Sequence, residues 1–135
     1  MPLDLSPLEN AIVSLEDAIR IMNRGSVDTP SEFLRDSVIQ RFEYTYELAW
    51  KFMKRWLSEN LGPSYVDGVP RRELFRLAAE NRLIGPTPPW MGYHKARDEA
   101  SHAYNEIIAA DVCAAARLFA TDARPLLVAL KARND

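Results

Sequence analysis

Apolar residues recur with a helical period along this chain, and no stretch alternates in the manner of a β-strand. In the first segment they step by four and three residues, which places them on one face of a helix. This apolar stripe consists of Leu8, Ile12, Leu15, Ile19 and Met22. We therefore predict a first helix that ends at Gly25, because glycine suits the C-terminus of a helix.

The second segment contains no glycine and no further proline between Pro30 and Gly62. It predicts a helix of about 30 residues, or about 45 Å at 1.5 Å per residue. Aromatic and apolar residues fall on more than one side of its middle, so most of its circumference should be packed. We expect this helix to be the central element of the fold, with Tyr44, Tyr46 and Trp50 in the core.

Two shorter helices should follow, the second of them after the proline-rich break at residues 85–89. A last, alanine-rich helix is expected from Ile107 to about Ala120, with Pro125 breaking or kinking it before the final leucine-rich turns. The pattern as a whole predicts an all-α, up-and-down helical bundle of about five helices with a four-helix-bundle-like core. Residues 1–135 should form a single domain.

Composition narrows the class of protein. Hydrophobic residues make up 47% of the chain and charged residues 27%, as in ordinary soluble domains. The formal net charge of −2 argues against a dedicated nucleic-acid-binding protein, which usually carries a basic excess. No apolar run approaches the roughly 18 residues that span a membrane, and the N-terminus does not resemble a signal peptide. The single Cys113 fits a buried free thiol in a reducing compartment, so we expect a cytoplasmic protein.

The candidate chemistry is concentrated in residues 97–104, which hold an arginine, a histidine and a tyrosine. Arginine binds phosphate as a rigid two-pronged fork, and histidine exchanges protons near neutral pH. Together these side chains suit the making or breaking of phosphate ester bonds. The competing interpretation is a solvated helix face with ordinary i,i+4 pairs.

On an unbroken helix, at about 100° per residue, the polar residues of this segment occupy two neighbouring faces. One face holds Arg97, Ser101 and Tyr104, and the other holds Asp98, His102 and Asn105. Asp98 would then hold the His102 imidazole in one tautomer. Arg97 and His102 would lie about 140° apart, so they converge only if the helix is distorted or a ligand or second chain fills the space. A symmetric dimer would build one groove from two copies of this surface.

Other polar residues carry weaker signals. Glu43 and Glu47 lie one turn apart on the long second helix, with basic residues nearby, so we expect ion pairs there rather than acid–base chemistry. His94 and His102 lack the i,i+4 spacing of a zinc site, and no glycine-rich phosphate loop occurs. We expect His94 on the surface and predict neither a metal nor another cofactor.

Two segments resemble the signature blocks of the nucleotidyltransferase substrate-binding proteins, which belong to the wider HEPN superfamily of small helical bundles. They are residues 41–51 and 97–106. The second block is the more specific of the two. It follows the HEPN pattern of arginine, four residues, histidine, any residue and tyrosine, with Arg97, His102 and Tyr104 in those places.

The resemblance covers roughly residues 5–120 and implies a minimal nucleotidyltransferase as partner. In one interpretation, the chain is a non-catalytic substrate-binding subunit of a two-component nucleotidyltransferase. In the other, it is the toxin of a toxin–antitoxin pair, a metal-independent endoribonuclease that the nucleotidyltransferase silences by transferring AMP to Tyr104. A homodimer or larger homo-oligomer and contact with RNA are further expectations.

For the ribonuclease, the resemblance implies a role for each residue of the second block. His102 would act as general base or acid on the 2′-hydroxyl or the leaving oxygen, and Arg97 would stabilise charge on the phosphorane. Asp98 would orient His102, and Tyr104 would be the modification site. The supporting residues would be Ser101, Asn105, Glu43, Tyr44 and Glu47.

Overall fold

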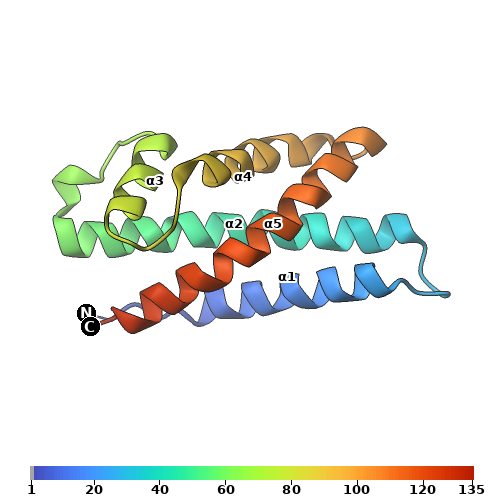
Figure 1. The fold of residues 1–135 in the computed structure, drawn as a ribbon, viewed down its shortest axis with the longest axis horizontal. Coiled ribbons are helices and arrows are strands. Elements are labelled where there is room, and N and C mark those ends of the chain that lie inside the picture. Colours follow the sequence, from blue (N-terminus) through green and yellow to red (C-terminus); the bar gives the residue numbers. More distant parts are fainter. Residues whose placement is uncertain (1) are drawn as a thin grey trace.

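The computed structural model describes residues 2–135, and this part of the chain forms five α-helices and no strand (Figure 1). The predicted all-α bundle is therefore confirmed. The α-helices are α1 (Ser6–Arg24), α2 (Ser31–Leu61), α3 (Arg71–Glu80), α4 (Thr87–Glu99) and α5 (Glu106–Ala132). Two 3₁₀ turns, η1 (Pro63–Tyr65) and η2 (Ala100–His102), lie between α2 and α3 and directly after α4.

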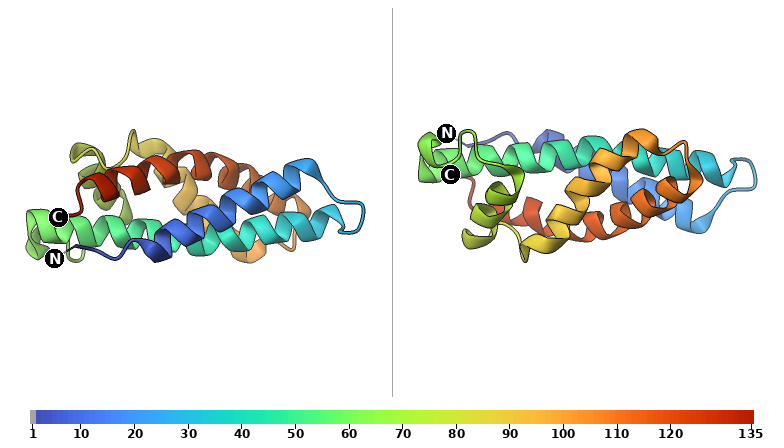
Figure 2. Two further views of the ribbon diagram at one scale, coloured as in Figure 1. Left: turned by 90° about the horizontal axis from the view of Figure 1, so that it is seen from below. Right: turned by 90° about the horizontal axis from the view of Figure 1, so that it is seen from above.

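The long helix α2 spans the length of the molecule, and the other helices pack around it (Figures 1 and 2). α1 lies along one side of α2, while α3 and α4 follow one another along a different side. α5 crosses obliquely and contacts α1, α2 and α4. The chain ends meet at one end of the bundle, where Asn134 makes two hydrogen bonds, of 2.7 and 2.8 Å, with the backbone of Leu3.

The apolar pattern of the sequence explains the first two helices. Leu8, Ile12 and Leu15 are fully buried, which confirms the predicted stripe on α1. α2 runs for 31 residues without interruption, as its lack of internal glycine and proline predicted. The chain leaves α1 at Gly25, whose φ of 77° lies in the region that glycine tolerates best.

The centre of the core is an aromatic cluster around Phe119 of α5. Its ring lies 5.3 and 6.1 Å from those of Phe42 and Tyr46 on α2, and 5.7 and 5.4 Å from those of Trp90 and Tyr93 on α4. Three of these four contacts are edge-on pairs with interplanar angles above 75°, a favourable aromatic geometry. Phe119 therefore joins α2, α4 and α5 and fixes their relative positions.

The break expected as one outcome at Pro125 does not occur, because α5 continues through this residue to Ala132. A proline inside a helix removes one backbone hydrogen bond and usually breaks or kinks the helix. Here Ala123, Leu126 and Leu127 are buried on either side of it, and tertiary packing of this kind outweighs local propensity. Within residues 2–135, no helix is both long and apolar enough to cross a membrane.

Replacing Phe119 by alanine should lower the free energy of unfolding by about 3–5 kcal/mol, because it leaves a cavity where three helices meet. Leu118→Ala is the matched control, since Leu118 is the neighbouring residue on α5 and is 62% exposed. Leu118→Ala should lower the free energy of unfolding by no more than about 0.5 kcal/mol. Urea denaturation followed by circular dichroism measures both values. Similar losses in the two variants would show that Phe119 does not hold the core together.

Candidate functional site

The arginine–histidine–tyrosine segment lies at a corner of the chain and not along a single helix. α4 ends at Glu99, η2 follows, and α5 begins at Glu106. Asn105 caps α5: its Oδ1 accepts hydrogen bonds from the backbone N–H groups of Ile107 (2.9 Å) and Ile108 (3.1 Å). Its φ and ψ of −81° and 126° are extended, as an N-cap requires, so α4 cannot continue as far as Asn105. Residues 97–105 therefore do not form one unbroken helix. The structure has the other arrangement named above, in which the helix is distorted within the motif.

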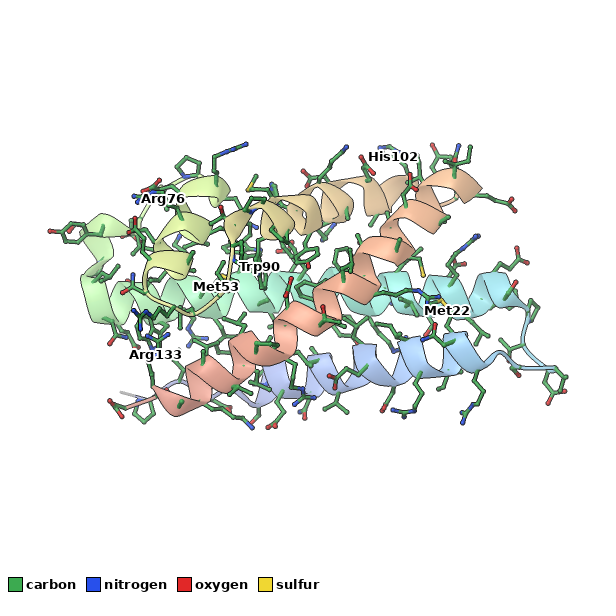
Figure 3. The ribbon with its side chains drawn as sticks, in the orientation of Figure 1. Met22, Met53, Arg76, Trp90, His102 and Arg133 are labelled. Atoms are coloured by element: carbon green, nitrogen blue, oxygen red, sulfur yellow. The ribbon has the colours of Figure 1, made fainter. Side chains whose placement is uncertain are left out.

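The corner separates the side chains of the motif. Arg97, on the last turn of α4, is half-buried, whereas His102 and Tyr104 are exposed after the helix has ended. Figure 3 shows His102 at the outer edge of the molecule, beyond the end of α4. Tyr104 is 85% exposed, and its ring lies 6.2 Å from the His102 ring, centre to centre. Among the hydrogen bonds and ion pairs of residues 2–135, none joins Arg97 to His102.

Arg97 is held by two carboxylates from α2. Its Nη1 lies 3.4 Å from Glu43 Oε2, and its Nε lies 3.3 Å from Glu47 Oε1. Glu43 and Glu47 thus form ion pairs, as predicted, although their partner comes from α4 and not from the basic residues near them on α2. The Nε atom is shielded from solvent and its geometry toward Glu47 is too poor for a hydrogen bond. Because two negative charges flank one positive charge, Arg97 offers a phosphate little net attraction in this arrangement.

A groove of about 400 Å³ opens between α2 and the corner. Its walls include Asp36, Gln40 and Glu43 from α2 and Ser101, Ala103 and Tyr104 from the corner. The groove therefore brings together three of the predicted site residues, Glu43, Ser101 and Tyr104. It combines carboxylate and hydroxyl groups. Inside the corner, the Ser101 hydroxyl donates a 3.3 Å hydrogen bond to the carbonyl oxygen of Asp98.

Two other candidates lie elsewhere than expected. The Asp98 carboxylate is 3.8 Å from Nε2 of His94, one turn back on α4, and no ion pair between Asp98 and His102 occurs in the described chain. The helix ends between Asp98 and His102, so the i,i+4 pairing expected of them cannot form. Tyr44 is partly exposed instead of buried, and it faces α1, where its hydroxyl donates a 2.9 Å hydrogen bond to Ser14 Oγ. Neither residue lines the groove at the corner.

The sequence did not reveal a polar cluster that lies between the middle of α2, the start of α3 and the middle of α4. The Tyr46 hydroxyl lies 2.9 Å from Nδ1 of His94 and accepts a 3.0 Å hydrogen bond from Nη1 of Arg71. The Arg71 guanidinium also stacks on the Trp50 indole, 3.7 Å from the ring centre. His94 was expected on the surface, but it is half-buried in this cluster.

Hydrogen-bonding capacity limits the protons of the cluster. Arginine only donates, so the Tyr46 hydroxyl accepts from Arg71. Toward His94 it either gives its own proton to Nδ1 or accepts one from it, depending on the imidazole tautomer. Burial raises the pKa of Tyr46 to about 12, an effect that Arg71 partly offsets, so this hydroxyl keeps its proton at neutral pH.

Glu47 joins this cluster to the ion pairs of Arg97 in one polar stretch. Its Oε2 accepts a 3.1 Å hydrogen bond from the Trp50 indole, while its Oε1 faces Arg97. We call this stretch the α2–α4 seam; it comprises Arg71, Tyr46, Trp50, His94, Glu47, Glu43, Arg97 and Asp98. Across residues 2–135, no group of three or more histidine, cysteine, aspartate or glutamate side chains is arranged to hold a metal ion.

The fold and the corner define a class of small all-α bundle with an arginine on the last turn of one helix and an exposed histidine–tyrosine pair just beyond it. The family described as "Nucleotidyltransferase substrate binding protein like" matches residues 3–132. This chain belongs to that family, which is the one that the signature blocks indicated.

Individual relatives agree with this assignment. The chain is 31% identical to a Haemophilus influenzae protein described as "Probable ribonuclease HepT", over 98% of this chain and 95% of the relative. A solved structure from Haemophilus influenzae, described as the fold of a substrate binding domain of a nucleotidyltransferase, superposes with a TM-score of 0.87 at 30% identity. That match covers 95% of this chain and 99% of the other. A second structure, from Thermus thermophilus, has a TM-score of 0.77 at 28% identity and covers 92% and 98% of the two chains.

Proposed function

We propose that this protein is the helical partner of a minimal nucleotidyltransferase and acts in the cytoplasm as a metal-independent endoribonuclease, the toxin of a toxin–antitoxin pair. The observation that carries the proposal is the exposed pair of His102 and Tyr104 at the corner directly after Arg97. A packing role would bury these rings, whereas chemistry on a large substrate requires them to be accessible. The name of the ribonuclease relative supports the cleavage activity, and the description of the Haemophilus influenzae structure supports the link to a nucleotidyltransferase.

The cleavage chemistry needs only proton transfer and charge stabilisation. A base takes the proton of the RNA 2′-hydroxyl, and the oxygen attacks the adjacent phosphorus. The bond to the 5′-oxygen breaks, and an acid returns a proton to that leaving oxygen, which yields a 2′,3′-cyclic phosphate and a 5′-hydroxyl. His102 supplies the proton transfers, and Arg97 stabilises the negative charge that builds up on the phosphorane.

This chemistry requires a second copy of the chain. Within one chain, Arg97 turns toward α2 while His102 points away from the bundle, so one corner does not surround a phosphate. In a symmetric homodimer that joins two corners, His102 of one copy would meet Arg97 of the other. Each of the two sites formed in this way would contain one His102, which takes the proton of the 2′-hydroxyl and returns it to the leaving oxygen.

Tyr104 is the proposed control point. Its hydroxyl would attack the α-phosphorus of ATP on the partner nucleotidyltransferase, lose its proton and release pyrophosphate, which leaves AMP on the tyrosine oxygen. The attached nucleotide adds bulk and negative charge next to His102, because the two rings are 6.2 Å apart. RNA phosphate would then be excluded from the corner.

The first test uses expression of the protein without its partner. The wild type should stop growth and cleave RNA, whereas His102→Ala should relieve the arrest and lower the cleavage rate by about 10²- to 10⁴-fold. His102 is exposed, so circular dichroism should give the same melting temperature for both proteins. Equal toxicity of the wild type and a folded His102→Ala variant would remove the catalytic role.

The second test concerns the modification. Incubation with the partner nucleotidyltransferase and ATP should add AMP to the wild type, as measured by intact-protein mass spectrometry. Tyr104→Phe should abolish the mass increase. Tyr65→Phe is the matched control, because Tyr65 is also an exposed tyrosine, at 68%, but lies at the far end of α2. Modification that persists in Tyr104→Phe would contradict the proposed control point.

A second candidate function is that of a non-catalytic substrate-binding subunit. The groove at the corner favours it, since Asp36 and Glu43 would attract a small cationic substrate. In that case Glu43→Gln should raise the KM of the partner nucleotidyltransferase for its substrate, while His102→Ala should leave growth and turnover unchanged. The two functions therefore predict opposite results for His102→Ala in the growth assay.

A further inference from the structure

We propose that Arg71, with Tyr46, Trp50 and His94, forms a phosphate-binding subsite that holds the RNA strand at a distance from the cleavage corner. The inference rests on the proposed ribonuclease function and adds a second point of contact with the substrate. The subsite is the end of the α2–α4 seam formed by Arg71 at the start of α3 and His94 in the middle of α4, whereas His102 lies beyond the C-terminal end of α4 (Figures 1 and 3).

Arg71 is fixed in place by two aromatic residues. Its Nη1 donates to the Tyr46 hydroxyl at 3.0 Å, and its guanidinium plane lies 3.7 Å from the centre of the Trp50 ring. A guanidinium that is already oriented loses less side-chain freedom when it binds an anion than a mobile one does. Tyr46 uses only one of the five N–H donors of Arg71, so the others remain for a ligand.

No carboxylate neutralises the charge of Arg71 within the described chain. Among residues 2–135, no carboxylate forms an ion pair with it, whereas Arg97 faces both Glu43 and Glu47. Lys51 adds a second cation at the same place, with Nζ 5.7 Å from the centre of the Trp50 ring. Two cations lie against this indole and one carboxylate, that of Glu47, accepts its N–H. One positive charge is therefore in excess here, and an anion would neutralise it.

His94 lies beside this arginine. It shares the Tyr46 hydroxyl with Arg71, and its Nε2 lies 3.8 Å from the Asp98 carboxylate, too far for a hydrogen bond. When its proton lies on Nε2, the imidazole can donate to a phosphate oxygen.

One extended RNA strand could contact both the subsite and the corner. His94 lies five residues before the end of α4 at Glu99, about 7.5 Å along the helix axis, and His102 follows in the turn beyond it. A strand that follows the α2–α4 seam would meet Arg71 at one end and the cleavage corner at the other. The acidic middle of the seam, with Glu43, Glu47 and Asp98, adds no attraction for phosphate, so affinity would depend on the Arg71 end.

Binding of a strand can be measured without cleavage. The probe is a fluorescein-labelled, single-stranded 2′-O-methyl RNA oligonucleotide, which lacks the hydroxyl that attacks phosphorus. Fluorescence anisotropy with the full-length protein at several salt concentrations gives the Kd and its salt dependence. Arg71→Met should weaken binding about tenfold or more and reduce the salt slope by about one. Arg72→Met, which removes the same charge from the neighbouring exposed arginine, should weaken it less than about threefold.

A second pair of variants covers the case in which Arg71→Met does not fold. Arg71→Lys keeps the charge but loses the planar fork, and it should still weaken binding about threefold or more, whereas Arg72→Lys should have no effect. Equal affinities of the Arg71 and Arg72 variants would overturn the subsite. Displacement of the labelled strand by an equimolar amount of AMP would also overturn it, because the site would then hold a mononucleotide and not a strand.

The outcomes separate this inference from the proposed function. If Arg71 governs binding but His102→Ala does not affect cleavage, the subsite stands and the ribonuclease mechanism fails. If His102→Ala abolishes cleavage while the Arg71 and Arg72 variants bind alike, the mechanism stands and the subsite fails.

Discussion

The site depends on one constraint, the reversal of the chain between α4 and α5. Both helices must pack against α2 and against each other, and Phe119 holds them there through its contacts with Trp90 and Tyr93. The chain must therefore leave the helical path after Glu99, and Asn105 completes the turn by capping α5. This geometry leaves Arg97 facing α2 and exposes the residues that follow. On a single continuous helix, Tyr104 would share the face of Arg97 and turn toward α2.

Charge is distributed unevenly along the α2–α4 seam. At the corner end of the seam, Glu43 and Glu47 neutralise Arg97, which orients its guanidinium but reduces its attraction for phosphate. At the α3 end, Arg71 is fixed by aromatic contacts and carries no carboxylate partner within the described chain. Glu47 links the two ends through the indole of Trp50. One end of the seam therefore suits orientation of a reacting group, and the other suits substrate binding.

The sequence was sufficient for the architecture because helical periods and glycine or proline breaks are local signals. It failed where packing or distant contacts decide the outcome. Pro125 stays inside α5 because buried neighbours hold that helix together. The corner had a local signal in Asn105, a favourable capping residue directly before a predicted helix. The i,i+4 spacing of His94 and Asp98 was also visible, but no local pattern relates Arg71 to Tyr46, because their contact joins residues 25 positions apart.

The central claim is that a catalytic site needs Arg97 from one copy of the chain and His102 from another. Complementation tests it most directly, by measuring RNA cleavage after Arg97→Ala and His102→Ala proteins are mixed, partly unfolded and refolded together. Each variant alone should be inactive. The mixed dimer should regain activity, because one of its two sites combines the intact arginine of one chain with the intact histidine of the other. A mixture that forms heterodimers but stays as inactive as either variant alone would contradict the shared site and place both residues in the same chain.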